Sequence, residues 1–519
     1  MADTHPADMD LLEAAAALQT GELSSRELTA ACLERVAQRE RRFGAFIRVY
    51  ELQAAEDAFR ADEVRASGSA GPLTGLPMAL KDVIGVAGLP LTADSAVLEG
   101  NVAPADATAW TRLQASGMVL IGHLHCGEFA NGVWGRNPWG PTFSAGGSSS
   151  GSGIALAGRM VPATLGTDTR GSIRMPAAFM GITGVKPTFG LVSTAGCIPF
   201  SYTADVVGPM ARSAADCAAL LQVMAGPDPA DRATLSQPAA PAAYPTTPRP
   251  GQHPLAGVRI GIPSFGANQP SAGVAAVYAR FQDDLAGLGA TLVSFPWPDN
   301  PLERGGHNIG DWMHILGAEI QVIHEQFADR SHLYREEFLG LLAPMRTAGT
   351  AVDYVRAQVA RADLIDTWTR LFAEHELSAV THPACQDELF RTDVELTYEE
   401  LPRLMLGVWN DTGFPVVSIP AGLSPADQSP VGMQLAGLPH TEAVLLQVAI
   451  DVQAATEHHR QSPPDLDHGP DYVPPARHAA DPQPPYAPGH SALNASIPVH
   501  PSATFCSRST SGSVTRGVQ

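Results

Sequence analysis

Lys81 is the first residue whose setting suggests chemistry, because it interrupts an apolar run, MALKDVI, at residues 78–84. Lysine is rarely buried without a role, since removing water from an ammonium group is costly. Burial lowers the pKa of the amine and can leave a neutral base near physiological pH. The alternatives are a lysine that extends to solvent from a strand end, or one that pairs with an acidic side chain.

A block rich in Ser and Gly, SAGGSSSGSG at residues 144–153, is a second candidate. Residues 147–151 match G-x-S-x-G, in which Ser149 would be the nucleophile of a strand–turn–helix elbow. That elbow requires an apolar strand directly before it, and the preceding NPWGPTF is typical of a turn, so we reject this interpretation. A P-loop is excluded because no G-K-[ST] follows. A flexible linker is the alternative, although the apolar segment IALAG follows at once.

A third candidate is GTDTRGSIRMPAAF at residues 166–179. Ser172 follows Gly171 there, where consecutive backbone N–H groups can converge and stabilise an oxyanion without any side chain. The alternative is a glycine turn between a strand and the next helix.

The segment HLHC at residues 123–126 offers metal-ligand types, but a closed site needs further ligands. We interpret it as a packing segment and expect no metal.

Alternating strand-like and helical patterns must position these residues, and they predict an α/β fold with a large mixed sheet between helices, in one large domain. The expected strands lie at residues 75–87, 118–122, 161–166, 258–263, 290–296 and 414–423, and the expected helices at 10–40, 106–117, 154–158, 271–290, 310–375 and 440–456. Within residues 10–40, Ser24 and Glu27 form a capping-box pattern before ELTAACLERV, which predicts a helix start there. Residues 227–255, rich in Pro and Ala, predict an exposed loop.

The 519-residue chain carries 33 basic and 53 acidic residues, a net charge of −20. Such a surface repels phosphate backbones, so we expect no nucleic-acid partner. Its six Cys form no CxxC pair, no secretory signal opens the chain, and no apolar run predicts a membrane span. We therefore expect a cytoplasmic protein that does not contact membranes.

Pro, His, Ser and Ala dominate the last segment, and we expect residues 465–519 to be disordered.

Taken together, these segments resemble the amidase signature family. GLPMALKDVIGVAG resembles the family's G-x-P-x-x-x-K-D segment, and GGSSSGSG resembles its G-G-S-S-G-G-S block. GTDTRGSIRMPAAFMGITGVKPTFGLVS resembles its G-[ST]-D-x-G-G-S-[IV]-R-x-P-A run, and the similarity resumes in NDTGFPVVSIPAG and PVGMQLAGLPHTEAVLLQVA. The resemblance implies the family's fold over residues 1–464, with a variable helical region at about residues 300–375 that shapes the substrate pocket.

By motif position, the resemblance implies that Lys81 is the base, Ser148 a relay that follows a cis peptide bond, and Ser172 the nucleophile. The backbone N–H groups that would hold the oxyanion belong to Thr169, Arg170, Gly171 and Ser172. Arg170 departs from the family pattern, which has glycine there. Its N–H group is kept, but a positive φ would be unfavourable at this residue, and its side chain would extend into the substrate mouth.

The implied activity is hydrolysis of an amide-type carbon–nitrogen bond through an acyl-enzyme, without a cofactor, on a small-molecule amide, carbamate or ester. Two alternatives stay open: the glutaminase subunit of a tRNA-dependent amidotransferase, and a catalytically silent binding protein on the same fold. We leave the oligomeric state open, with a homodimer as one option. The expected pocket segments are residues 128–134, 197–202 and 310–375, where Trp312, Met313 and Trp409 would line the pocket or else belong to the core.

Overall fold

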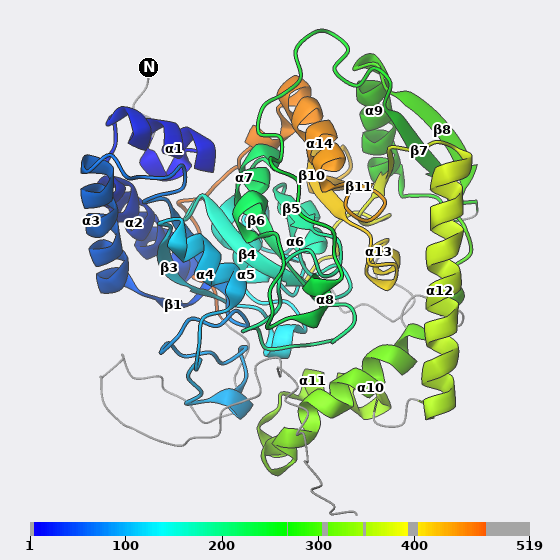
Figure 1. The fold of residues 1–519 in the computed structure, drawn as a ribbon, viewed down its shortest axis with the longest axis horizontal. Helices are drawn as coiled ribbons and strands as arrows, with labels where there is room; N and C mark the ends of the chain where they lie inside the picture. Colours follow the sequence, from blue (N-terminus) through cyan, green and yellow to red (C-terminus); the bar gives the residue numbers. More distant parts are fainter. Residues whose placement is uncertain (1–4, 267, 304–309, 346–348, 393–402, 474–519) are drawn as a thin grey trace, which may run out of the picture.

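The computed structural model describes residues 5–473 without 267, 304–309, 346–348 and 393–402. Eleven strands of this described part form one mixed sheet. In sheet order, the strands are β1 (Phe46–Val49), β3 (Val119–Leu124), β2 (Pro77–Lys81), β4 (Ala163–Asp168), β6 (Val206–Ala211), β5 (Thr183–Lys186), β10 (Val416–Leu423), β11 (Pro430–Ala436), β9 (Ala379–Pro383), β7 (Arg259–Ser264) and β8 (Thr291–Pro296). β2 runs parallel to β3 and β4, and β7 runs parallel to β8 and β9, whereas the other pairs are antiparallel. Figure 1 shows the sheet running from β1 on the left to β8 on the right.

Helices cover both faces of this sheet. The described helices are α1 (Leu11–Thr20), α2 (Ser25–Phe43), α3 (Glu51–Ala66), α4 (Thr108–Ala115), α5 (Ser150–Ala157), α6 (Arg174–Phe179), α7 (Ala214–Met224), α8 (Arg232–Leu235), α9 (Ala272–Gly287), α10 (Trp312–His324), α11 (Glu336–Met345), α12 (Ala351–Glu374), α13 (Gly407–Asp411) and α14 (Glu442–Thr456). Successive residues of a strand face opposite sides. Gly184 of β5 lies against Ala177 of α6, whereas Thr183 accepts a hydrogen bond from Gln453 of α14 at 2.9 Å. The expected single α/β domain, with a mixed sheet between helices, is confirmed.

Most expected elements are present, with some differences. Residues 10–40, expected to be helical, form the two helices α1 and α2, because Gly21 adopts a left-handed conformation that ends α1. Ser24 then begins α2 with the predicted capping box. The loop expected at residues 227–255 contains the short helix α8. The sequence did not predict strands β1, β5, β6, β9 and β11.

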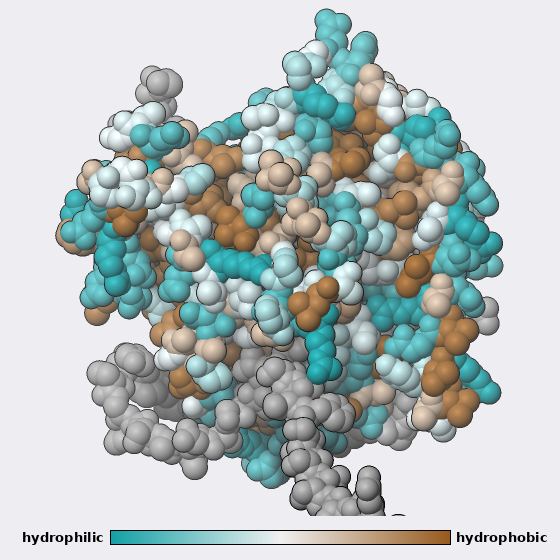
Figure 2. Space-filling model, in the orientation of Figure 1, coloured by the Kyte–Doolittle hydropathy of each residue, from teal (hydrophilic) through white to brown (hydrophobic). Residues whose placement is uncertain are grey.

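The helices of residues 310–375 lie at one end of the molecule, where α10 and α11 extend below the sheet and the long α12 runs along its side (Figure 1). Phe129 packs on this region, with ring centroids 5.7 Å from Phe327 and 5.6 Å from Phe338. Figure 2 shows hydrophobic residues on the lower part of α12, where Val352, Val355 and Val359 are exposed on one helical face. Among the described helices, none combines the length and apolar character needed to cross a bilayer.

The described chain continues nine residues beyond position 464, where we placed the domain boundary. Asp467 pairs with the buried Arg39 of α2 at 2.8 Å, and the Tyr472 hydroxyl accepts a hydrogen bond from the Gly135 N–H at 3.2 Å. These contacts hold the first part of the C-terminal segment on the domain. The boundary itself stays a prediction, and residues 474–519 lie outside the described residues.

A buried ion pair joins four of these elements near the centre of the sheet. Arg174, the first residue of α6, donates to both oxygens of Asp168 at the end of β4, at 3.0 and 3.1 Å. The same guanidinium donates to Gln434 of β11 at 2.8 Å and to Asn410 of α13. Neither charged side chain is exposed to solvent. The pair therefore fixes the end of β4 relative to α6, α13 and β11.

We expect Arg174→Met to lower the free energy of unfolding by about 3–5 kcal/mol, because Asp168 would stay buried as a carboxylate without its cation. Urea denaturation followed by circular dichroism measures this loss. The matched control is Arg26→Met, since Arg26 pairs with Asp62 at 3.1 Å but is 61% exposed, and we expect it to change stability by less than about 1 kcal/mol. Equal losses in the two variants would contradict the central role of the buried pair.

Candidate active site

Lys81 is the last residue of β2, and its side chain is wholly buried. Its Nζ atom lies 2.8 Å from the Ser148 Oγ and 2.8 Å from the Thr167 Oγ1, with the Thr167 carbonyl oxygen at 3.4 Å. Burial lowers the pKa of Lys81 to about 8. The amine therefore does not reach solvent, it contacts hydroxyl and carbonyl oxygens, and it can lose its proton near neutral pH.

Ser148 lies in the Gly-rich segment directly before α5. The peptide bond between Gly147 and Ser148 is cis, and the Ser148 side chain is almost completely buried beside the Lys81 amine. The neighbouring Ser149 is fully buried, donates to the Thr167 carbonyl at 3.2 Å and accepts from the Thr167 N–H at 3.3 Å. Ser149 therefore secures the start of α5 against β4, which fits the rejection of an elbow nucleophile.

The loop that carries Ser172 is shaped by Asp168, the last residue of β4. Its carboxylate accepts from the N–H groups of Gly171 at 2.7 Å and Ile173 at 3.0 Å. Burial opposes ionisation of this carboxyl, but Arg174 outweighs it and holds the pKa of Asp168 well below its usual range. Gly171 has a φ of 113°, in a region that L side chains rarely adopt. Asp168 and Gly171 together set the turn that presents Ser172.

Ser172 is half-buried, and its carbonyl oxygen accepts a hydrogen bond from the Ser149 N–H at 3.1 Å. This bond places the backbone of Ser172 beside the segment that carries Ser148. In the described part of the chain, the Ser148 and Ser172 side chains do not form a hydrogen bond with each other. Such bonds are often long in an enzyme without substrate and tighten when substrate binds.

Arg170 adopts a negative φ, so the unfavourable backbone conformation falls on Gly171 instead. Its Nη1 atom pairs with the Asp411 Oδ1 of α13 at 2.7 Å. Its guanidinium carbon lies 4.0 Å from the centre of the Trp312 ring of α10. The side chain therefore leaves the loop and contacts the helices that cover it.

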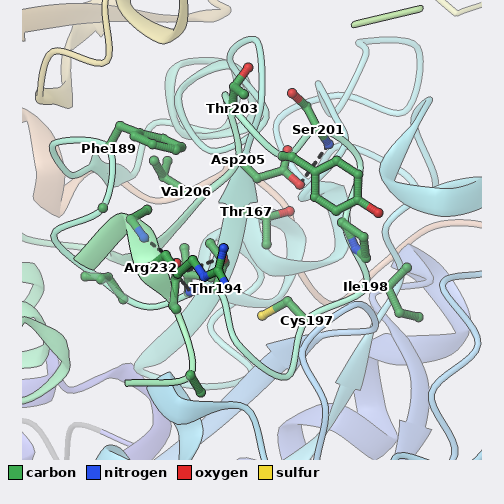
Figure 3. Close-up of a pocket in the computed structure, with 18 of the residues that line it drawn as sticks. Thr167, Phe189, Thr194, Cys197, Ile198, Ser201, Thr203, Asp205, Val206 and Arg232 are labelled. Atoms are coloured by element: carbon green, nitrogen blue, oxygen red, sulfur yellow. Dashed lines mark hydrogen bonds between the residues drawn. The ribbon is translucent and has the colours of Figure 1, made fainter. Parts of the chain in front are cut away.

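A cavity of about 670 Å³ opens beside the site, a volume typical of small-molecule pockets. Thr167 lies on its wall between Asp205 and Cys197 (Figure 3). Burial raises the pKa of Asp205 to about 6, and its carboxylate accepts from the Thr169 hydroxyl at 2.6 Å. The cavity thus borders Thr167, which contacts the Lys81 amine, and Asp205, which holds Thr169 of the Ser172 loop.

The expected pocket segments are only partly found at this cavity. Residues 197–202 contribute Cys197, Ile198, Pro199, Ser201 and Tyr202, whereas its described lining includes nothing from 128–134. Trp312 instead lines a separate small cleft over the Ser172 loop. Trp409 belongs to the core, where it is fully buried and donates to His382 at 2.9 Å.

The segment HLHC forms packing contacts. His123 contacts the Tyr50 hydroxyl at 2.7 Å and the Ile84 carbonyl at 3.0 Å. His125 pairs with Asp94 at 2.6 Å and stacks on Trp134. The described residues contain no group of three or more His, Cys, Asp or Glu arranged to hold a metal ion.

Several residues of the site gave no separate signal in the sequence. Asp168 and Arg174 lie within the third candidate segment, and their spacing around Ser172 could have suggested an ion pair that closes the turn. Thr167, Asp205 and Asp411 act only through contacts that the fold creates. Sequence spacing alone does not bring them together.

Comparison with known proteins gives a consistent result. The family model for amidases, described as Amidase, matches residues 27–446. The A subunit of glutamyl-tRNA(Gln) amidotransferase from Thioalkalivibrio sulfidiphilus is 35% identical, with 87% of this chain and 98% of that protein covered. The same subunit from Chloroflexus aurantiacus is 37% identical, with coverage of 87% and 97%.

Among solved structures, the native peptide amidase from Stenotrophomonas maltophilia superimposes with a TM-score of 0.75 and 29% identity, covering 89% of this chain and 99% of that chain. The corresponding glutamyl-tRNA(Gln) amidotransferase protein from Thermotoga maritima, at 23% identity and a TM-score of 0.73, shows the same fold over 90% of this chain and 100% of its own. The family match and the nearly full-length relatives agree with the motifs around Lys81, Ser148 and Ser172. The chain belongs to the amidase family.

Proposed function

We propose that this enzyme hydrolyses a carbon–nitrogen bond of an amide-type substrate through an acyl-enzyme on Ser172, with Lys81 as base and Ser148 as relay. The observation that carries the proposal is the 2.8 Å contact between the buried Lys81 amine and the Ser148 hydroxyl. A serine hydroxyl is a poor nucleophile until a base removes its proton. A buried amine with a pKa of about 8 suits that task.

In the acylation step, the neutral Lys81 amine takes the Ser148 proton while Ser148 takes the proton of Ser172. The Ser172 oxygen forms a bond to the carbonyl carbon, and the carbonyl oxygen becomes an oxyanion. As the carbon–nitrogen bond breaks, the relay returns the proton to the leaving nitrogen. Water then attacks the acyl-enzyme along the same proton path, releases the acid and restores Ser172.

The oxyanion would be held by backbone N–H groups of the loop of residues 169–172. The Gly171 N–H already donates to Asp168 at 2.7 Å. A substrate oxygen would therefore draw mainly on the N–H groups of Thr169, Arg170 and Ser172. The loop keeps this geometry because Asp168 and Arg174 fix it from the buried side.

We assign the substrate to non-peptide amides, with carbamates and esters as related acyl donors. The same attack on a carbonyl serves all three, and the leaving group alone differs. The cavity of about 670 Å³ reaches the site through Thr167, a contact of the Lys81 amine, and its volume suits a small molecule. A catalytically silent binding protein is the weaker candidate, because Lys81, Ser148 and Ser172 are all present.

A second candidate is the A subunit of a glutamyl-tRNA(Gln) amidotransferase. The observation that favours it is 35–37% identity to such subunits over nearly their whole length. On this ground the curated relatives favour the amidotransferase subunit over the stand-alone amidase that the sequence led us to expect. Both candidates use the same acyl-enzyme and differ in the fate of the released nitrogen.

We expect a fluorophosphonate probe to label the wild-type chain and to leave Ser172→Ala unlabelled, because the probe reacts with an activated serine. Ser149→Ala is the matched control, since Ser149 is a buried neighbour of Ser148 that hydrogen-bonds to Thr167. We expect this control to be labelled. Labelling of Ser172→Ala at the wild-type rate, or loss of labelling in Ser149→Ala alone, would overturn the choice of nucleophile.

We expect kcat/KM for amide hydrolysis to rise with pH and to level off above an inflection near pH 8, because only the neutral Lys81 amine accepts a proton. Lys81→Arg should lose about 10²–10⁴-fold in rate, since a guanidinium stays charged. Lys186→Met is the control, because burial also lowers the pKa of Lys186, to about 7. If Lys186→Met loses the inflection near pH 8 in its pH profile of kcat/KM, the assignment of Lys81 as base is wrong.

For the second candidate we expect the chain to be purified from its own cells together with further subunits in fixed ratio. The purified assembly should release ammonia from glutamine, and Ser172→Ala should abolish this release. Mass spectrometry of the assembly and an ammonia assay measure the two properties. A chain without partners that hydrolyses aryl amides and leaves glutamine intact excludes this candidate.

A further inference from the structure

The side of the Ser172 loop that faces α10, α12 and α13 is closed by Arg170. Its guanidinium lies between the Asp411 carboxylate, at 2.7 Å, and the Trp312 ring, at 4.0 Å. An ion pair and a cation–π contact together hold a flexible side chain in one place. Four-fifths of the Arg170 side chain is shielded from solvent. The arginine is therefore part of a wall beside Ser172.

The backbone of α13 leaves room for this guanidinium. A Cβ atom at Gly407 would lie 2.1 Å from the Arg170 Nη2 and 2.7 Å from its Cζ. Any side chain at position 407 would therefore displace the guanidinium. The lack of a side chain at Gly407 therefore leaves the space that the guanidinium occupies.

Hydrogen bonds also hold in place the residues that lie around Arg170. Arg361 of α12 donates to the Asp411 carbonyl oxygen at 2.6 Å and to the Thr203 carbonyl oxygen at 2.7 Å. Glu319 of α10 accepts from the Thr203 hydroxyl at 2.8 Å. These bonds join α10, α12 and α13 around the guanidinium and hold the residues that it contacts.

The space left between Arg170 and these helices is small. A cleft of about 20 Å³ lies there, lined by Thr169, Arg170, Trp312, Arg361 and Asp411 among others. That volume holds about one water molecule. The cleft is far smaller than the cavity of about 670 Å³. Ser201 and Thr203 line both spaces and so lie between them.

Stereochemistry decides which part of a substrate meets this wall. The leaving nitrogen must receive its proton from Ser148, so it lies on the side of Lys81. The acyl substituent lies on the opposite side of the carbonyl carbon and points away from Lys81. Thr169, Arg170 and Trp312 line a cleft on the loop that carries Ser172, and we take this cleft as the place of the acyl substituent.

We propose that Arg170 is a specificity-determining residue that shortens the acyl side of the site, so that the enzyme prefers short acyl groups. The proposal rests on the acyl-enzyme mechanism at Ser172. We attribute the effect to volume rather than charge, because the Asp411 carboxylate pairs with the guanidinium at 2.7 Å. Removing the side chain opens the cleft, whereas an uncharged side chain of similar length keeps it closed.

The test uses p-nitroanilides of acetic, butyric and hexanoic acid, which vary the acyl group and keep one leaving group. We expect kcat/KM of the wild-type enzyme to fall along this series. Arg170→Gly should raise the hexanoyl-to-acetyl ratio of kcat/KM by at least about tenfold, the usual effect of fitting extra methylene groups into a pocket. Arg170→Met, which keeps the volume, should retain the wild-type order of substrates.

Trp312→Ala opens the same cleft from α10 without touching the Ser172 loop, and it should shift the ratio in the same direction. Thermal midpoints and fluorophosphonate labelling show which variants are folded and keep an active serine. An unchanged ratio in both Arg170→Gly and Trp312→Ala, with labelling intact, would refute the wall. A rise in Arg170→Met equal to that in Arg170→Gly would overturn the role of volume and show that charge sets the preference. Loss of Ser172-dependent labelling in the wild type would instead refute the mechanism.

Discussion

The burial of the Lys81 amine is the constraint on which the rest of the site depends. A buried ammonium ion would normally require a carboxylate, and that carboxylate would raise the pKa of the lysine and keep it protonated. The amine instead contacts the hydroxyl groups of Ser148 and Thr167. These groups satisfy its hydrogen bonds without charging it. The parallel neighbours β3 and β4 keep the end of β2 dry, which preserves the low pKa.

Asp168 lies directly after Thr167 in the chain, and Arg174 neutralises its carboxylate. Asp168 gives both oxygens to Arg174 and accepts the N–H of Gly171. The negative charge that could have paired with the lysine is used to shape the turn that carries Ser172. The buried ion pair therefore engages the Asp168 carboxylate and fixes the turn that carries Ser172. Such a pair adds little net stability over an apolar core, so its role in geometry is the physical reason for its presence.

The sequence predicted the parts of the protein that depend on local pattern. The capping box at Ser24 predicted the start of α2, and the apolar run around Lys81 indicated a buried strand. Strand β6 was missed because Gly208 and Pro209 argue against a strand in isolation; it forms because β4 and β5 flank it. The assignment of Lys81, Ser148 and Ser172 came from the family motifs rather than from spacing. Contacts between distant segments, such as Thr169 with Asp205, follow from the fold and have no sequence pattern of their own.

Arg170 bears on both the backbone of the Ser172 loop and the substrate side of the site. The left-handed conformation of the loop falls on Gly171, so an arginine at the preceding position costs the backbone nothing, and its consequences lie on the substrate side. The curated relatives are amidotransferase subunits, and the cleft beside Arg170 has a volume of about 20 Å³. Overall similarity follows descent, whereas substrate choice follows the side chains around the carbonyl. In this chain Arg170 contacts both Asp411 and Trp312 beside the Ser172 loop, so these side chains bear directly on the choice between the two candidate functions.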